Sequence, residues 1–344
     1  MKEIWSRCGC SEMKHYHHGI SKIRSLFVDI SSPTLPAALS SGKLRQFLQR
    51  HPLVCYFVMA YGFSWLAWLP YILSQTGLGV LPIQLSQLAI LPGAYLGPLL
   101  SGFLMTAATE GKPGVYRLLH RIILWRVGWQ WYLLVLIGVP GIIVLGFLTL
   151  PGAMVALHLS SFPQLVAFFP LFLLLEIFTS GLAEEPGWRG FALPRLQDRY
   201  GPLQGTVILG LLWGGWHLPL FLTKRAANAS GLAIFGFILS VVGTAIVITW
   251  VFNHTRGSLL IAILLHATID AFSSAAATTG LFSLQWMLNN EYLAQLISFG
   301  VVGVVLIVVT RGRLGYQRAS SPSDTAPILN DGTPLSLSNE SIVR

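Results

Sequence analysis

The sequence predicts an all-α fold, namely a polytopic membrane helix bundle with about eight transmembrane helices. Three observations support this: the composition, a series of long apolar stretches, and the distribution of basic residues between loops. Of the 344 residues, 53% are hydrophobic and 10% are charged, and the mean hydropathy is +0.65. A soluble domain carries roughly 25% charged residues, because water must wet its surface. The composition therefore excludes a soluble enzyme.

Eight stretches approach the length that a membrane helix requires, which is about 20 mostly apolar residues. They are 53–73, 86–107, 129–150, 164–183, 203–222, 232–252, 258–279 and 293–310. Proline interrupts a helix because it lacks the N–H and clashes with the preceding turn. Pro170, Pro194 and Pro202 therefore make the ends of the fourth and fifth stretches the hardest to place.

Basic residues predict the orientation of the bundle, because cytoplasmic loops carry an excess of Lys and Arg. With the N-terminus inside, every Lys and Arg except Lys224 and Arg225 falls on the cytoplasmic side. We therefore expect an integral, multi-pass protein of the plasma membrane with both termini in the cytoplasm. The net charge of +9 is sorted by membrane side rather than gathered in one patch, so no nucleic-acid partner is expected.

The sequence divides into three regions. Residues 1–50 are predicted to form a polar cytoplasmic arm with a short interfacial helix around 42–49, and residues 51–312 the transmembrane bundle. Residues 313–344 are rich in Ser, Pro, Asp and Asn, a composition typical of a disordered tail.

Ionisable groups inside a membrane are costly, so each is a functional candidate. The apolar stretches and their ends contain seven: Glu176, Glu184, Glu185, Arg189, His217, His266 and Asp270. Glu185 and Arg189 are four residues apart on one helix face, so we expect them to pair. Glu184 points elsewhere and has no partner nearby in the sequence, which makes it a candidate general base. The alternative is that both glutamates lie in cytoplasmic water at a helix end.

Two histidines lie in separate apolar stretches. His217 follows the glycine pair 214–215 and precedes Pro219, which allows close helix approach and loosens the local backbone. His266 and Asp270 are four apart, so they share a helix face, where the carboxylate could fix the imidazole tautomer or share oxyanion binding. The alternatives are a structural core histidine at 217 and a buried pair that ties two helices together.

Together these residues suit the activation of water against a peptide carbonyl. Glu184 and a histidine could do this without metal. Zinc held by Glu184, His217 and His266, as in a metalloprotease, is the alternative, although the sequence contains no HExxH motif.

Three motifs resemble those of the CPBP family of intramembrane proteases, which includes the type II CAAX prenyl endopeptidases. They are EEPGWR at 184–189, WGGWH at 213–217 and HATID at 266–270. The family pattern is EExxxR, then an aromatic residue four positions before a histidine, then HxxxN or HxxxD. The resemblance covers residues 165–280. Trp213 replaces the commoner Phe, and Asp270 stands where Asn is often found.

The resemblance implies an intramembrane endopeptidase that acts on a membrane-associated or C-terminal peptide, including the C-terminus of a prenylated protein. It implies that Glu184 is the base acting on water, with His217 as its partner. His266 and Asp270 would orient or stabilise the oxyanion. An ionised aspartate cannot donate a hydrogen bond, so Asp270 departs from that role.

The resemblance assigns Glu185 and Arg189 a supporting role. One geometric problem follows from the predicted helices, because His217 lies about 14 residues, roughly 21 Å, into the helix after Glu184. The two can meet only if the fourth helix extends past Arg189 or if the connection dips into the bundle. Two functions of other classes remain alternatives: a secondary transporter with a Glu/His proton relay, and a catalytically silent membrane scaffold.

Overall fold

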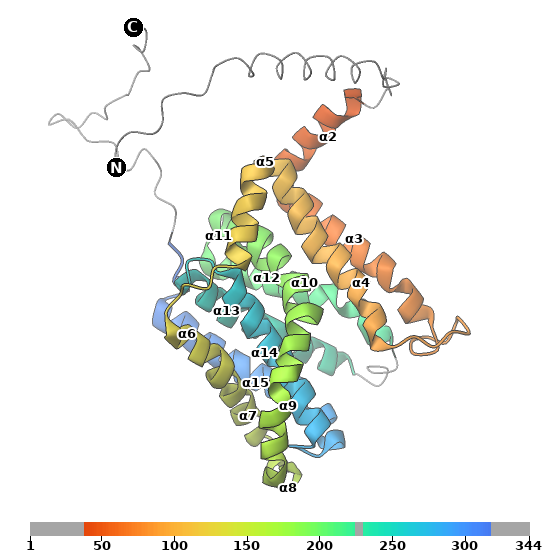
Figure 1. Cartoon of the computed structure of the whole chain (residues 1–344), viewed down its shortest axis with the longest axis vertical. Coiled ribbons are helices and arrows are strands. Elements are labelled where there is room, and N and C mark those ends of the chain that lie inside the picture. Colours follow the sequence, from red (N-terminus) through yellow and green to blue (C-terminus); the bar gives the residue numbers. More distant parts are fainter. Residues whose placement is uncertain (1–37, 224–229, 318–344) are drawn as a thin grey trace, which may run out of the picture. The chain divides into compact units, whose positions relative to one another are not determined.

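The computed structural model describes residues 38–223 and 230–317 (Figure 1). Most of the predicted N-terminal arm and nearly all of the predicted disordered tail lie outside these residues. The chain divides into two units, Met1–Gln46 and Phe47–Arg344. Of the first unit, the structure describes only the beginning of helix α2 (Ala38–Arg50), which contains the helix expected around 42–49.

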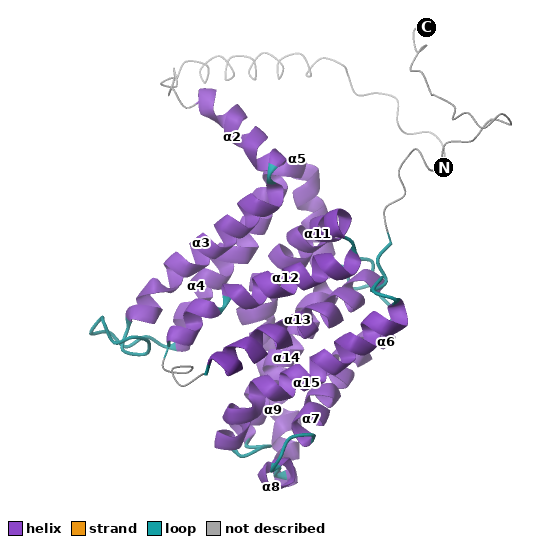
Figure 2. Ribbon diagram, turned by 180° about the vertical axis from the view of Figure 1, so that it is seen from behind, coloured by secondary structure: helices purple, strands orange, loops and turns teal. Residues whose placement is uncertain are grey.

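The described residues form helices and loops, and none of them belongs to a named strand (Figure 2). Eight helical spans are long and apolar enough to cross a membrane: Pro52–Leu73, Gln87–Ile122, Trp129–Leu148, Leu159–Tyr200, Pro202–Leu222, Gly231–His254, Leu259–Thr279 and Leu284–Thr310. The predicted all-α bundle of about eight transmembrane helices is therefore confirmed.

Several spans are built from consecutive segments. The first is α3 (Pro52–Leu73), and the second contains η1 (Gln87–Ile90), α4 (Leu91–Ala94), η2 (Tyr95–Leu99) and α5 (Leu100–Ile122). The third contains α6 (Trp129–Leu133), η3 (Leu134–Gly138) and α7 (Val139–Leu148), and α8 (Ala153–Ala156) follows it. The fourth contains η4 (Leu159–Ser161), α9 (Phe162–Glu176), η5 (Ile177–Gly181), α10 (Leu182–Glu185), η6 (Pro186–Ala192) and α11 (Leu193–Tyr200). The remainder are α12 (Pro202–Trp216) with η7 (Leu218–Leu222), then α13 (Gly231–His254), α14 (Leu259–Thr279) and α15 (Leu284–Thr310).

The fourth span is much longer than expected, since it continues to Tyr200 instead of ending near residue 183. Segments η5 and η6 within it are π-helical, and π turns commonly occur as insertions inside α-helices. Pro186 begins η6 and Pro194 falls in the first turn of α11, where each new segment tolerates the missing N–H. The span ends only at Gly201, whose φ of 85° is accessible to glycine.

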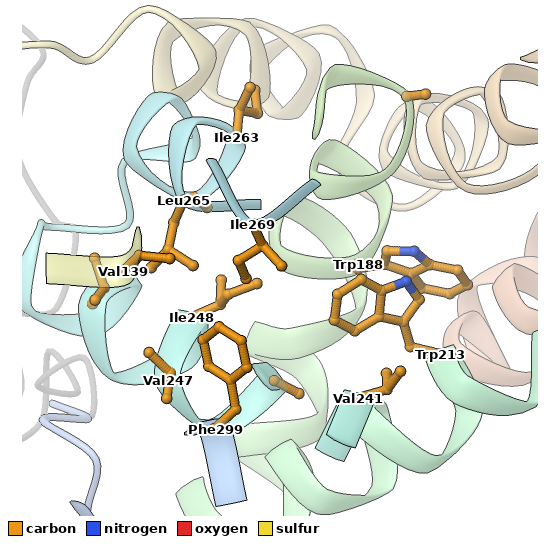
Figure 3. Close-up of a cluster of buried hydrophobic side chains, with 14 of the residues drawn as sticks. Val139, Trp188, Trp213, Val241, Val247, Ile248, Ile263, Leu265, Ile269 and Phe299 are labelled. Atoms are coloured by element: carbon orange, nitrogen blue, oxygen red, sulfur yellow. The ribbon is translucent and has the colours of Figure 1, made fainter. Parts of the chain in front are cut away.

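Helix α14 lies at the centre of the bundle, because 78% of its apolar stretch is buried. It packs against α9, α13 and α7, and Figure 3 shows its side chains Ile263, Leu265 and Ile269 within one buried cluster. A helix that is apolar all round and buried is typical of the core of a membrane bundle. The central helix is also the one that carries His266 and Asp270, so both are placed by well-packed backbone.

Candidate active site

Glu184 is buried inside the bundle, on α10 in the middle of the long fourth span. Its Oε2 accepts hydrogen bonds from the indole Nε1–H of Trp188, at 3.1 Å, and of Trp213, at 2.7 Å. Trp188 and Trp213 lie beside each other at one edge of the buried cluster in Figure 3. No hydrogen bond engages the other carboxylate oxygen, Oε1, within the described residues. The two indoles therefore hold one oxygen of Glu184 and leave the other for water or substrate.

The expectation that Glu184 has no partner nearby in the sequence is wrong. Trp188 is four residues further along the same helix, a spacing that places two side chains on one face. The signal was present in the sequence, because a buried indole N–H usually finds an acceptor. The partnership with Trp213 required the tertiary structure, since the two residues come from different spans.

Glu185 and Arg189 form the predicted pair, with Arg189 Nη1 at 2.8 Å from Glu185 Oε1. Both side chains are fully buried, and the Arg189 guanidinium also stacks over the Trp213 ring at 4.2 Å. The alternative that both glutamates lie in water is wrong, because Glu184 is 6% exposed and Glu185 is 0% exposed. The pair anchors the fourth span directly beside Glu184.

His217 lies where α12 ends and the 3-10 helix η7 begins. Its Nδ1 is 2.8 Å from the carbonyl oxygen of Trp213. A carbonyl oxygen can only accept, so Nδ1 carries a proton and donates it. In the neutral ring Nε2 then carries a lone pair. This tautomer leaves Nε2 able to accept a proton or to receive a hydrogen bond from water.

His266 on α14 lies between two carboxylates. Its Nδ1 is 2.9 Å from Glu185 Oε1, and its Nε2 is 3.5 Å from Asp270 Oδ2. The spacing of His266 and Asp270 predicted the second contact, which is longer than an ordinary hydrogen bond. The contact with Glu185 could not be predicted, because it joins spans that are 81 residues apart in the sequence.

A cavity of about 570 Å³ opens beside these groups, and Glu184, His217 and Asp270 all line it. The sequence left open how Glu184 could approach the helix that carries His217. Of the two possibilities given there, the structure has the first, a fourth helix that extends past Arg189. The fourth span continues past Arg189 to Tyr200, so Glu184 lies at a depth in the bundle that α12 also reaches. Glu184 and Trp213, four residues before His217, are consequently in direct contact.

The residues predicted to hold zinc do not form a ligand set in this arrangement. Among residues 38–223 and 230–317, no three His, Cys, Asp or Glu side chains are grouped closely enough to hold one metal ion. The donor chemistry is consistent with this, because Glu184 Oε2 already receives two indole protons and His266 Nδ1 faces Glu185. We therefore derive no reaction step through a metal.

Comparison with known proteins agrees with the three motifs. Residues 166–272 match the model of the family described as type II CAAX prenyl endopeptidase Rce1-like. This segment is therefore similar to the CAAX protease family. A stretch of 114 residues is also 35% identical to CAAX prenyl protease 2 of Methanococcus maripaludis. The resemblance stated from the motifs is thus confirmed.

The relationship to that relative is partial. The match covers 32% of this chain and 41% of the relative, so the chain matches about two fifths of the relative's length. The family segment extends from α9 to α14 and contains all three motifs. The first three spans and α15 lie outside it.

Proposed function

We propose that this membrane protein is an endopeptidase of the CAAX-protease type that hydrolyses a peptide bond with water activated by Glu184 and His217. One observation carries the proposal. Glu184 and His217 come from different spans but line the same cavity, and in each of them an atom able to accept a proton has no hydrogen-bond partner among the described residues. Within a membrane, polar groups at a cavity mark a site of function.

In the proposed reaction, a water molecule lies between Glu184 Oε1 and His217 Nε2. Glu184 takes a proton as the water oxygen attacks the carbonyl carbon, which becomes tetrahedral with a negative oxygen. When the C–N bond breaks, the same proton passes to the leaving amine. One water is consumed, and the immediate products are a carboxylic acid and an amine, which ionise to a carboxylate and an ammonium.

Stabilisation of the negative oxygen is assigned to His266, assisted by Asp270. His266 Nδ1 already faces Glu185, so Nε2 can donate to an oxyanion only if both ring nitrogens are protonated. The carboxylates of Glu185 and Asp270, one beside each nitrogen, would balance that positive charge. Asp270 then acts through His266 and does not itself donate to the oxyanion. Glu185 and Arg189 are positioning residues under this proposal.

The substrate that we propose is a membrane-associated or C-terminal peptide, including a prenylated one. The support is the family of the central segment and the name of the relative, a CAAX prenyl protease. The cavity walls are also partly apolar, since Trp68, Leu88 and Phe172 line them. Such walls suit a substrate that enters from lipid.

The deciding experiment compares purified full-length protein with its Glu184→Gln variant on a mixed pool of prenylated and plain C-terminal peptides. Removing a general base is expected to lower hydrolysis by about 100-fold or more, while the bundle stays folded because the side-chain shape is kept. Equal cleavage by both proteins would remove Glu184 from the mechanism. Cleavage by neither would favour the transporter or the silent scaffold. In a parallel arm with chelator, a loss that zinc restores would overturn the metal-free step.

A further inference from the structure

A second glutamate lines the cavity and has no part in the proposed reaction. Glu176 is the last residue of α9, eight residues before Glu184. The π turn η5 lies between them and takes more residues per turn than an α-helix. Eight residues therefore complete about two turns, and both glutamates project from one side of the span into the same cavity.

The surroundings of Glu176 favour a carboxylate that accepts hydrogen bonds. The Thr179 hydroxyl donates to Oε2 at 2.7 Å, and the Ser274 hydroxyl donates to Oε1 at 3.4 Å. Within the part of the chain that the structure describes, no Lys, Arg or His side chain pairs with Glu176. The residue lines the cavity, and no cation of residues 38–223 or 230–317 balances its carboxylate, which is costly at membrane depth.

Ser273 provides an independent sign that this wall binds something. Ser273 lines the same cavity and is only 8% exposed, and its buried Oγ has no hydrogen-bond partner among the described residues. Buried polar atoms are nearly always hydrogen-bonded, so an orphaned one calls for an explanation. Ser273, Ser274 and Glu176 all line this cavity, and Ser274 bonds Glu176. Ser273 and the Glu176 carboxylate are therefore part of the same cavity lining.

The charge of the cavity indicates what this wall would accept. Its lining includes Glu176 and Glu184, neither of which forms an ion pair with a described Lys or Arg, and none of its described lining residues is Lys or Arg. A cleft lined by one sign of charge between low-dielectric walls concentrates its field and attracts the opposite charge. A group that donates hydrogen bonds and carries positive charge would satisfy both Glu176 and Ser273.

We propose that Glu176 and Ser273 form a subsite for a cationic side chain of the substrate, a lysine or an arginine. The inference rests on the proposed protease function and names a feature of its substrate. Eight helical residues separate Glu176 from Glu184, which is about 12 Å along the axis. An extended peptide advances about 3.3 Å per residue, so the basic residue lies about three to four residues from the bond that is cut. A carboxylate at that position is disfavoured.

The test uses purified full-length protein and a set of peptides. Each peptide carries either lysine or norleucine at one position, and that position is varied up to four residues on each side of the cleaved bond. Norleucine keeps the apolar stem but lacks the charge. The peptides of this set are acetylated at their amino ends. One further peptide, without the acetyl group, tests whether a terminal ammonium can replace the lysine side chain. A hydrogen bond to a charged group predicts about a tenfold or larger preference in kcat/KM for lysine at one position.

Glu176→Gln is expected to bring the lysine-to-norleucine ratio close to one. The ratio is measured within one preparation, so it is independent of the fraction of protein that is folded. Glu110→Gln is the matched control, since Glu110 pairs with Arg117 and Arg195 outside the cavity lining and should keep the ratio. If Glu176→Gln fails to fold, Ser273→Ala, which loses no described hydrogen bond, should still lower the ratio several-fold.

The outcomes separate this inference from the proposed function. Cleavage that depends on Glu184 but shows no charge preference, or a preference that survives Glu176→Gln, overturns the subsite and leaves the protease. If nothing is cleaved, the proposed function fails, and binding of the same peptides is compared instead. Tighter binding of the lysine peptide to wild type, lost in Glu176→Gln, would still support the subsite, whereas equal binding would overturn it.

Discussion

At the scale of single residues, the orientation of the Glu184 carboxylate depends on two indole groups. A carboxylate that receives two N–H bonds on one oxygen has a fixed plane, so its second oxygen has a defined direction. Phenylalanine, the commoner residue of the family pattern at position 213, has a ring but no donor. Trp213 therefore adds a hydrogen bond of 2.7 Å that the usual aromatic could not make.

Trp213→Phe tests this contribution. It keeps an aromatic ring under Arg189 but removes the shorter of the two bonds to Glu184, so we expect kcat to fall about tenfold with little change in KM. Trp286→Phe is the control, because it also loses an indole bond, to the carbonyl of Pro151, but does not line the cavity. Steady-state kinetics on both variants, with thermal melting to verify folding, make the comparison. An unchanged kcat in Trp213→Phe would show that Trp188 alone suffices.

The buried pair of Glu185 and Arg189 makes a different prediction, which concerns stability. Breaking a buried ion pair leaves one charge without compensation, so Arg189→Met should destabilise the folded protein by about 3–5 kcal/mol. The double variant Glu185→Gln/Arg189→Met removes both charges and should recover part of that loss. Unfolding in detergent compares wild type, both single variants and the double variant. Additive losses would mean that the two residues do not act as a pair.

Much of this residue-scale picture was accessible from the sequence. The Glu185–Arg189 pair and the approach of His266 to Asp270 follow from spacings of four on a helix, where geometry alone brings side chains together. The contact of Glu185 with His266 joins separate spans, and no local spacing encodes it. The role of Glu176 was missed for a related reason, because the π turn that aligns it with Glu184 has no recognised signature in the sequence.

At the scale of elements, the long fourth span is held in place by close backbone contacts. A Cβ added at Gly187 would lie 2.2 Å from the carbonyl oxygen of Pro98 and 2.6 Å from the Tyr56 hydroxyl. A Cβ at Gly102 on α5 would lie 2.9 Å from the Cα of Gly187. Small residues permit such approaches between membrane helices. They fix η6, and with it the adjacent turn that carries Glu184.

Gly187→Ala should therefore cost about 1–3 kcal/mol of stability by overpacking, and it should also lower activity, because η6 must move away from η2. Gly141→Ala on α7 is the control, since nothing lies within 4 Å of its added Cβ. There alanine should be neutral or stabilising by up to about 1 kcal/mol. Melting temperature and kcat/KM are measured for both. Equal behaviour of the two variants would contradict the close approach at Gly187.

The fourth span also shows where prediction from proline fails. Proline was expected to make the ends of this helix hard to place, because it removes a backbone donor and clashes with the preceding turn. In the structure Pro186 begins segment η6, and Pro194 lies in the first turn of α11, where the missing backbone N–H is tolerated. Segments η5 and η6 are both π-helical. The pair Gly201–Pro202 was the better indicator of the end of the span, because Gly201 adopts a positive φ there and Pro202 begins the next helix. Eight spans could be counted without this detail, but the depth of Glu184 could not be obtained.

At the scale of the whole bundle, hydrogen bonds between loops reveal which connections share an end. Arg121 donates to the carbonyl of Gly257 at 2.8 Å, and Arg256 donates to the carbonyl of Arg126. The loop after the second span therefore meets the loop after the sixth. At another place, the His158 amide donates to the carbonyl of Leu281 at 2.8 Å, which joins the loops after the third and seventh spans. The second and sixth connections thus form one group, the even-numbered group, and the third and seventh connections form another.

The arginines of the even-numbered group predict that this end of the bundle faces the cytoplasm. In a variant with Cys8, Cys10 and Cys55 replaced by serine, single cysteines are introduced at Gln84, in the loop after the first span, and at Trp125, in the loop after the second. A membrane-impermeant maleimide should label position 84 in intact cells and position 125 only after permeabilisation. Both side chains are exposed, so a lack of labelling reports the membrane barrier and not burial. The reverse pattern would place the arginines outside and overturn the predicted orientation, and with it the assignment of both termini to the cytoplasm.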